Sequence, residues 1–281
     1  MIYMKIQYLG TAAAEGLPAL FCECEICRKA AALGGRNIRT RSQAIVDDKL
    51  LIDYPADTYM HFLRHGFPLN KIATCLITHS HGDHLYPAEI EMRKEGFSHL
   101  SDSLPLTFYS AESGYKKLKA VIDRYNIPKD RVDAVEIHPF EAFEADGYGI
   151  TPIKAEHDVN STPVIYAIEK DGKSLLYAHD SSEPCEESMD CLKAFAKPFD
   201  LISLDCTQGN DAVVPYIGHM NLNKCDRLRE RYIAYGIADK NTLFVLNHFS
   251  HNGSDAVYDD FVKIAEERGF ITSYDGMVIE F

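Results

Sequence analysis

The chain has 281 residues, of which 46% are hydrophobic and 25% are charged, and its formal net charge is −13. This length can bury one large core, and the composition excludes an intrinsically disordered chain. The negative charge argues against a nucleic-acid partner, because proteins that bind nucleic acids neutralise phosphates with a basic surface.

Targeting signals are not evident in the sequence. No apolar run is long enough to span a bilayer, and the first ten residues lack the pattern of a secretory signal. We therefore expect a cytoplasmic protein that does not enter a membrane. Because no linker or repeat divides the chain, we also expect a single domain over residues 1–281.

Short apolar runs alternate with helical patterns along the whole chain. The first half predicts a strand at Ile2–Leu9, a hairpin of Gln43–Val46 and Leu50–Ile52, a helix at Ala56–Arg64, a strand at Ala73–Ile77, a helix at Pro87–Lys94, a strand at Leu106–Tyr109 and a helix at Ser113–Tyr125. The second half predicts strands at Ala134–Ile137, Ile150–Ala155, Val164–Glu169 and Ser174–Ala178, then strands at Leu201–Asp205 and Thr242–Leu246, a helix at Asp255–Glu267 and a strand at Met277–Glu280. This order predicts an α/β protein in which helices sandwich two sheets.

The segment Thr78-His79-Ser80-His81-Gly82-Asp83-His84 places four potential metal ligands directly after a buried strand. Imidazole nitrogens and carboxylate oxygens suit a divalent ion such as zinc or manganese. Alternation directs His79 and His81 to the same side, and Gly82 lets Asp83 and His84 turn to a neighbouring point. One segment can thus serve two metals about 3.5–4 Å apart.

Two metals need more ligands than this segment supplies. Good candidates follow strands, where a loop can face the same pocket. His157, Asp180 and His248 each occupy such a position, and Asp180 has the carboxylate that can bridge two ions. Asp53, at the end of an early strand, is expected to support a metal-bound histidine.

Eight cysteines occur in the chain, and three of them form Cys22-x-Cys24-x-x-Cys27. Three thiolates are one ligand short of the closed tetrahedral set that structural zinc prefers. The other five are isolated, and we expect them to be reduced core residues.

The ordered series of histidines and aspartates resembles the ligand series of the metallo-β-lactamase superfamily, whose fold is a four-layer αββα sandwich. Within it the chain is most similar to the PhnP branch, the phosphoribosyl cyclic phosphodiesterases. Gly16-Leu17-Pro18 before the cysteine loop, and His248-Phe249-Ser250-His251, carry this second resemblance.

The resemblance implies a role for each ligand. His79, His81 and His157 would hold one metal, Asp83, His84 and His248 the other, and Asp180 would bridge them. A water between the two metals would be the nucleophile. His219 would assist the leaving group, so that Asp83 and His219 are the expected catalytic residues. His251 would complete a structural zinc site with the three cysteines of residues 22–27, and the protein would be a homodimer.

The expected function is therefore hydrolysis of a small or cyclic phosphodiester, with two active-site metals (zinc or manganese) and one structural zinc. Two alternatives stay open: an RNase Z-like nuclease, and a PqqB-like component of a biosynthetic pathway that binds rather than hydrolyses. The segments Gly96–Pro105 and Pro139–Tyr148 do not align with the PhnP branch, and we expect them to form the pocket wall.

Overall fold

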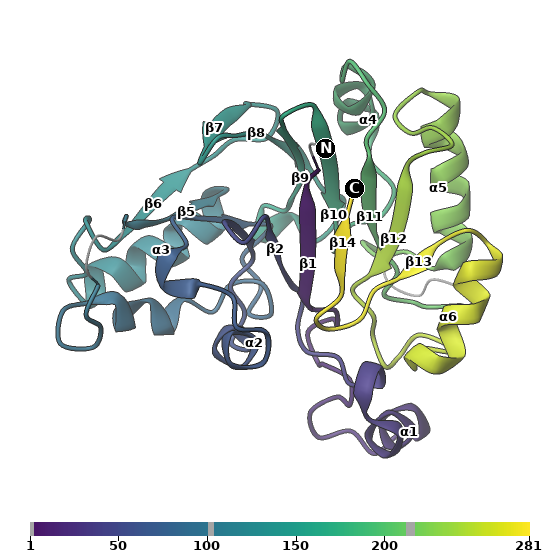
Figure 1. Ribbon diagram of the computed structural model, residues 1–281, viewed down its shortest axis with the longest axis horizontal. Coiled ribbons are helices and arrows are strands. Elements are labelled where there is room, and N and C mark those ends of the chain that lie inside the picture. The colour runs from purple at the N-terminus through teal and green to yellow at the C-terminus, as the bar shows by residue number, and fades with distance from the viewer. Residues whose placement is uncertain (1–2, 101–103, 212–216) are drawn as a thin grey trace.

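Two sheets lie face to face at the centre of the molecule (Figure 1). The structure is a computed structural model that describes residues 3–100, 104–211 and 217–281. Within these residues, the first sheet contains in spatial order β14 (Val278–Glu280), β1 (Lys5–Gly10), β2 (Gln43–Val46), β3 (Leu50–Ile52), β4 (Thr74–Ile77), β5 (Leu106–Ser110) and β6 (Val132–Glu136). The second contains β13 (Ile271–Thr272), β12 (Leu243–Asn247), β11 (Leu201–Asp205), β10 (Lys173–Ala178), β9 (Val164–Lys170), β8 (Tyr148–Lys154) and β7 (Phe143–Ala145).

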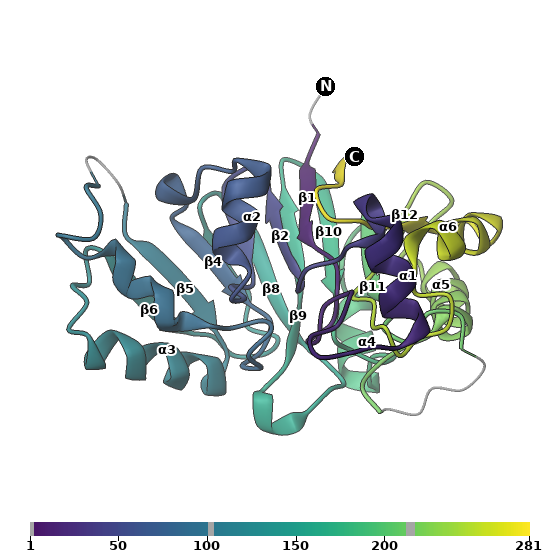
Figure 2. The same ribbon diagram turned by 90° about the horizontal axis from the view of Figure 1, so that it is seen from below.

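Helices cover the outer face of each sheet (Figures 1 and 2). The first sheet is flanked by α2 (Thr58–His65) and α3 (Glu112–Arg124). The second is flanked by α4 (Glu186–Lys193), α5 (Leu222–Ala234) and α6 (Tyr258–Glu267). The described residues also form four short 3₁₀ segments: η1 (Gly35–Asn37), η2 (Leu69–Lys71), η3 (Pro87–Arg93) and η4 (Val159–Ser161). The layers confirm the expected αββα sandwich.

Apolar side chains fill the three spaces between these four layers. The cluster between the sheets includes Tyr8, Tyr166 and Tyr177, all fully buried. A second cluster joins the other face of the second sheet to its helices, and a third joins the first sheet to α3 through Leu118 and Ile122. Burying a large apolar side chain contributes about 1.5–3 kcal/mol, so these layers hold the strand ends in fixed positions.

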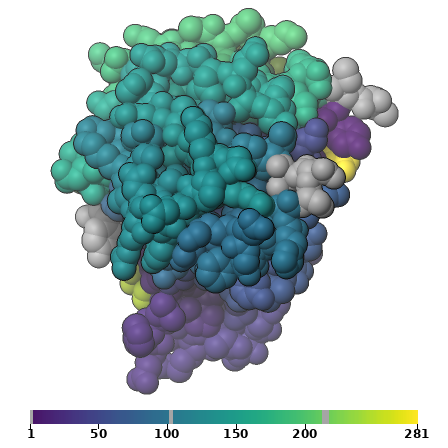
Figure 3. Space-filling view, turned by 90° about the vertical axis from the view of Figure 1, so that its left-hand side faces the viewer, coloured from purple at the N-terminus to yellow at the C-terminus, as the bar shows by residue number. Residues whose placement is uncertain are grey.

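The remaining helix, α1 (Glu25–Leu33), lies at one end of the sandwich together with the cysteine loop (Figure 1). Viewed from the side of β5 and β6, this N-terminal segment projects below a face made by the middle of the chain (Figure 3). Among the described residues, no helix combines the length and the apolar character needed to cross a bilayer.

Both hairpins expected from the sequence are confirmed. β2 and β3 pair antiparallel, and so do β9 and β10. Lys170 pairs with Lys173, which leaves Asp171 and Gly172 as a two-residue turn with φ of 50° and 83°. Positive φ at both positions defines a type I′ turn, whose twist matches that of the strands.

Several boundaries differ from the expected ones. The segment after Tyr86 is a 3₁₀ helix, and α6 begins at Tyr258 because Asp255 has a φ of 55°. The strand expected at Ala134–Ile137 begins two residues earlier, and Ile2 lies outside the described residues. The acidic run Glu183–Asp190 indicates the start of a helix, and α4 overlaps this run. The sequence patterns did not predict α1, α5, β7, β13 or the 3₁₀ segments η1, η2 and η4.

Candidate metal centre

Histidine and aspartate side chains gather at one edge of the sandwich, where several strands end. β10, β11 and β12 are parallel, so their carboxyl ends meet at this edge, as in other sheets that carry ligand sites. Asp180 and His248 follow two of these strands, and Asp205 ends the third. β3 and β4 are parallel in the other sheet and lead to Asp53 and to the segment from residue 78 to residue 84.

Three of these strand-end residues have a left-handed backbone. The φ angle is 67° at Asp53, 53° at Asp180 and 64° at His248. This conformation costs a residue with a Cβ atom about 1–2 kcal/mol. Such strain persists only where the surrounding structure holds the residue, and it is common at functional sites.

A first group of side chains brings together His79, His81, His157 and Asp180, whose potential ligand atoms all lie within 4.8 Å of one another. His79 Nε2 lies 3.0 Å from His81 Nδ1 and 3.2 Å from Asp180 Oδ2. His157 Nε2 lies 3.3 Å from His81 Nδ1. These are the residues expected to hold the first metal.

A second group brings together Asp83, His84, His248 and Asp180 within the same limit. His84 Nε2 lies 3.2 Å from His248 Nε2, 3.2 Å from Asp83 Oδ2 and 3.1 Å from Asp180 Oδ2. All four side chains are buried. Asp180 belongs to both groups, which is the position of a bridging ligand.

The chemistry of these atoms fits divalent cations. His84 and His248 direct their Nε2 atoms at each other, while their Nδ1 atoms face Asp53 Oδ2 and Thr207 Oγ1 at 2.7 and 2.8 Å. A neutral imidazole that donates through Nδ1 has only a lone pair at Nε2. Two lone pairs at 3.2 Å repel each other unless a proton or a metal cation lies between them. Asp180 Oδ1 is also buried without a hydrogen-bond partner, so the site has ligand capacity that the protein itself does not fill.

The imidazoles nearest to Asp180 set its charge. Burial alone would raise the pKa of Asp180, but His248, His79 and His84 outweigh burial and hold it well below its usual range. Burial lowers the pKa of His79 to about 4. Burial opposes protonation of His84, but Asp83 and Asp53 outweigh burial and raise the pKa of His84 well above its usual range. A metal that binds His84 Nε2 would therefore displace a proton from this ring.

Carboxylates behind the histidines orient the rings. Asp53 accepts hydrogen bonds from His84 Nδ1 at 2.7 Å and from the Thr78 backbone at 2.8 Å, as expected from its position. Asp158 accepts one from His81 Nε2 at 3.2 Å, and Asp205 lies 3.5 Å from His248 Nδ1. Such partners fix the ring orientation and raise the basicity of the ligand.

His219 borders the two groups. Its Nδ1 donates to Asp205 Oδ2 at 3.1 Å and lies 3.2 Å from Asp180 Oδ1. Burial opposes protonation of this ring, but Asp205 and Asp180 outweigh burial and raise the pKa of His219 to about 9. Cations at the neighbouring groups would offset the influence of Asp180 and leave Asp205 as the principal partner.

A cavity of about 330 Å³ opens over these residues. Its described lining consists of Ala13, Ala14, Glu15, His81, Asp83, His157, Asp180, Thr207, Gln208, His219, His248, Ser250 and Asn252. The expectation that Gly96–Pro105 and Pro139–Tyr148 form the wall is therefore wrong for their described residues; residues 101–103 lie outside the described ranges. Apart from the proposed metal ligands, the described wall comes from the loop after β1 and the loops after β11 and β12.

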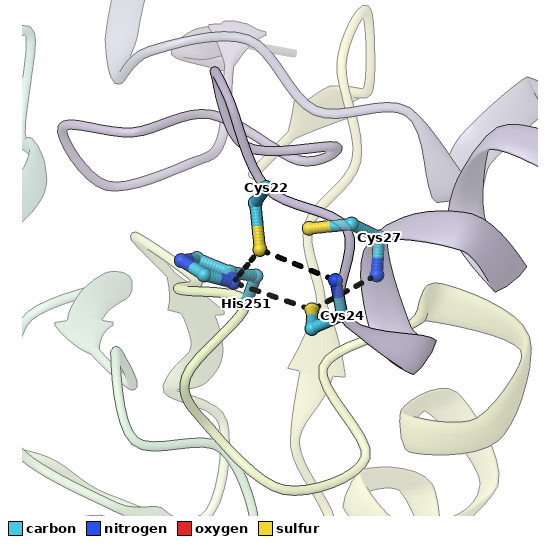
Figure 4. Close-up of side chains that lie close together, drawn as sticks. All are labelled: Cys22, Cys24, Cys27 and His251. Atoms are coloured by element: carbon cyan, nitrogen blue, oxygen red, sulfur yellow. Dashed lines mark hydrogen bonds between the residues drawn. The ribbon is translucent and has the colours of Figure 1, made fainter.

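The cysteine loop forms a separate group with His251 (Figure 4). His251 Nδ1 lies 3.5 Å from Cys22 Sγ and 3.5 Å from Cys24 Sγ. Cys24 caps α1 and Cys27 lies in its first turn, so the helix presents two of the three sulfurs. Burial opposes ionisation, but hydrogen bonds from His251 and the Cys27 N–H outweigh it and lower the pKa of Cys24 to about 6. Four donors of this type suit zinc.

The structure keeps other histidines away from both groups. His61 bonds to Gln43 at 2.6 Å, and His179 faces the core, where it bonds to Ser203 at 2.6 Å. His99 and His138 are exposed. All twelve residues expected at the two metal sites and at the leaving group, in contrast, lie within one of the groups described above.

A model of the β-lactamase superfamily domain matches residues 49–234. A search of curated proteins found no match. Among solved structures, a diphosphatase of the PhnP family superposes with a TM-score of 0.75 and 23% identity over 99% of this chain and 98% of that one. The Zn²⁺-bound PqqB from Methylobacterium extorquens superposes with a TM-score of 0.73 and 23% identity over 98% of this chain and 99% of that one. The short form of human tRNase Z superposes with a TM-score of 0.64 and 16% sequence identity, and the match covers 98% of each chain. These three proteins share the fold of this chain.

Proposed function

Because the chain belongs to the metallo-β-lactamase superfamily, we propose that it is a metal-dependent hydrolase of small or cyclic phosphodiesters. The observation that carries this proposal is the position of Asp180. Its carboxylate is shared by two groups of imidazoles and carboxylates, with His219 at 3.2 Å. Two-metal sites of this kind serve phosphatases and nucleases.

His79, His81 and His157 would hold one cation, and Asp83, His84 and His248 the other, with Asp180 between them. When bound, a divalent metal lowers the pKa of coordinated water from about 15.7 to about 7 and so supplies a nucleophile at neutral pH. Zinc and manganese both suit these ligands. The protein orients the ligands through Asp53, Asp158 and Asp205.

His219 is proposed to protonate the leaving oxygen. Asp205 holds the ring through Nδ1, and His219 lines the cavity, so its Nε2 proton is available to a substrate oxygen. A positioned proton donor contributes about 10²–10⁴-fold to such a reaction. The remaining machinery stabilises charge rather than moving protons.

The size and charge of the cavity favour a small substrate. About 330 Å³ is at the low end of the range for small-molecule sites. Its described lining contains no lysine or arginine, and the formal net charge of the whole chain is −13. An RNase Z-like role would need cationic contacts to several phosphates. RNA binding that weakens steeply with salt would support that role instead.

The PqqB-like alternative is a protein that binds its ligand without hydrolysing it, so it predicts no turnover of phosphodiesters. Both ligand groups contain at least three imidazole or carboxylate donors, which supports an enzyme. The structural similarity to a PhnP-family diphosphatase supports a phosphorylated compound as the substrate.

The test of the proposed function is turnover of bis(4-nitrophenyl) phosphate by protein loaded with zinc or manganese. We expect release of 4-nitrophenol that requires metal and is lost in Asp83→Ala. A fully metallated protein that is inert toward phosphodiesters would support the binding role and contradict the proposal.

We further propose that Cys22, Cys24, Cys27 and His251 hold a structural zinc that ties the N-terminal loop to the loop bearing His248. Cys24→Ser is expected to release about one metal ion per chain and to lower the melting temperature, because the metal-binding free energy contributes to folding. Elemental analysis and thermal unfolding measure both effects. Cys185→Ser, outside the cluster, is the control and should retain its metal. Unchanged metal content in Cys24→Ser would contradict the site.

A further inference from the structure

The part of the cavity wall that holds no proposed metal ligand includes two side chains with free hydrogen-bond acceptors. Glu15 comes from the loop after β1, and Gln208 from the loop after β11. Neither is needed for the proposed metal sites, so their chemistry bears on the part of the substrate that does not react.

Glu15 is held in place from one side. Ser250 Oγ donates a hydrogen bond to Glu15 Oε1, and His251 Nε2 lies 3.7 Å from the same oxygen. Among the described residues, no side chain bonds to Oε2. The Glu15 side chain is 28% exposed and lines the cavity. Ser250 therefore holds this carboxylate in the cavity wall, and His251 of the cysteine group lies beside it.

Gln208 is buried, with 2% of its surface exposed, and its Oε1 has no hydrogen-bond partner in the described structure. The Gln208 backbone N–H donates to Met220 O at 3.0 Å, which fixes the residue beside the cavity. An unpaired buried acceptor is unfavourable, and rotation of the Gln208 amide toward the cavity would let a donor on a bound ligand satisfy it.

The charges of the cavity favour the same kind of ligand. Glu15, Asp83 and Asp180 line the cavity, and the described lining has no lysine or arginine. Bound cations would neutralise Asp83 and Asp180, but Glu15 lies outside both metal groups and would keep its charge. A second phosphate on the substrate would face this carboxylate without a fixed cation to balance it.

We infer that the enzyme selects phosphodiesters whose non-reacting arm bears hydroxyl or ammonium donors and no second phosphate. Glu15 and Gln208 are the specificity-determining residues that accept hydrogen bonds from this arm. The inference rests on the proposed phosphodiesterase function and deepens it.

The experiment compares three diesters that all release 4-nitrophenol, so that the leaving group is constant. Their arms are cationic in 4-nitrophenyl phosphorylethanolamine, whose ammonium group donates hydrogen bonds, neutral in thymidine 5′-(4-nitrophenyl phosphate), and anionic in the 3′-phosphorylated form of that thymidine ester. With metal-loaded protein, we expect kcat/KM for the cationic and neutral arms to exceed that for the anionic arm by about tenfold or more, since a hydrogen bond to a charged group is worth about 1.5–3 kcal/mol.

Glu15→Gln keeps an oxygen for Ser250 but removes the charge, and it is expected to reduce the preference for the cationic over the anionic arm by about tenfold. Gln208→Leu breaks no internal side-chain hydrogen bond of Oε1, and it should raise KM for the thymidine ester more than it lowers kcat. Glu25→Gln, exposed on α1 and outside the cavity lining, is the control for the change in net charge and should keep the wild-type preference.

A preference for the anionic arm, or an unchanged ratio in Glu15→Gln, would overturn the inference while leaving the phosphodiesterase activity in place. If the metal-loaded protein turned over none of the three esters, the proposed function itself would be contradicted, and the inference would fall with it.

Discussion

Asp180→Asn is expected to lower kcat/KM for a phosphodiester by about 10³-fold or more and to release metal from both active-site positions. Asparagine has nearly the same volume but carries no charge and keeps only one oxygen. Asp180 is the one residue common to both proposed ligand groups, so its loss weakens both ions at once. The metals stabilise the charge of the transition state by several kcal/mol. Because each 1.36 kcal/mol of lost stabilisation lowers the rate tenfold, this loss corresponds to the expected decrease of about 10³-fold.

Metal content by elemental analysis and steady-state kinetics check this prediction together. Asp200→Asn is the matched control: Asp200 precedes β11 and lies at the opposite end of the strand from the metal centre, where it accepts a hydrogen bond from Lys173 at 3.0 Å. It should retain both metals and full activity. Asp180→Asn with a complete metal complement and wild-type rates would show that the shared carboxylate is not a bridging ligand.

The fold could be predicted from the sequence because alternating apolar runs and turn residues are local signals. Asp171-Gly172 between two apolar runs is sufficient to predict a type I′ hairpin. Other elements depend on tertiary contacts. β13 has two residues and forms only because β12 lies beside it, and α5 has a largely charged sequence whose buried residues pack against the second sheet.

The same distinction applies to the site. Four ligands within His79–His84 are adjacent in the sequence, so their convergence needs only one strand end. Asp205 also ends a buried strand, but a single aspartate there does not reveal that β11 lies between β10 and β12. Glu15 meets Ser250 across 235 positions of sequence, a contact that only the assembled loops create.

His219→Ala is expected to lower kcat by about 10²–10⁴-fold for a substrate with an alkoxide leaving group, such as a nucleoside 2′,3′-cyclic phosphate. The loss should be clearly smaller for bis(4-nitrophenyl) phosphate, because 4-nitrophenolate is stable enough to leave without a proton. Comparing the two substrates with wild type and variant measures this difference. His99→Ala is the control: His99 is exposed and belongs to none of the metal groups, so this variant should leave both rates unchanged.

The dependence on the leaving group separates proton donation from metal binding. His219 also lies within 4.8 Å of ligand atoms of Asp180, Asp205 and His248, an arrangement that by itself could hold a cation. A ligand role would predict the same loss for both leaving groups, together with a lower metal content. A donor role predicts unequal losses at constant metal content. Because Asp205 accepts from Nδ1 and leaves Nε2 to the cavity, the donor role is the one that the hydrogen bonding favours.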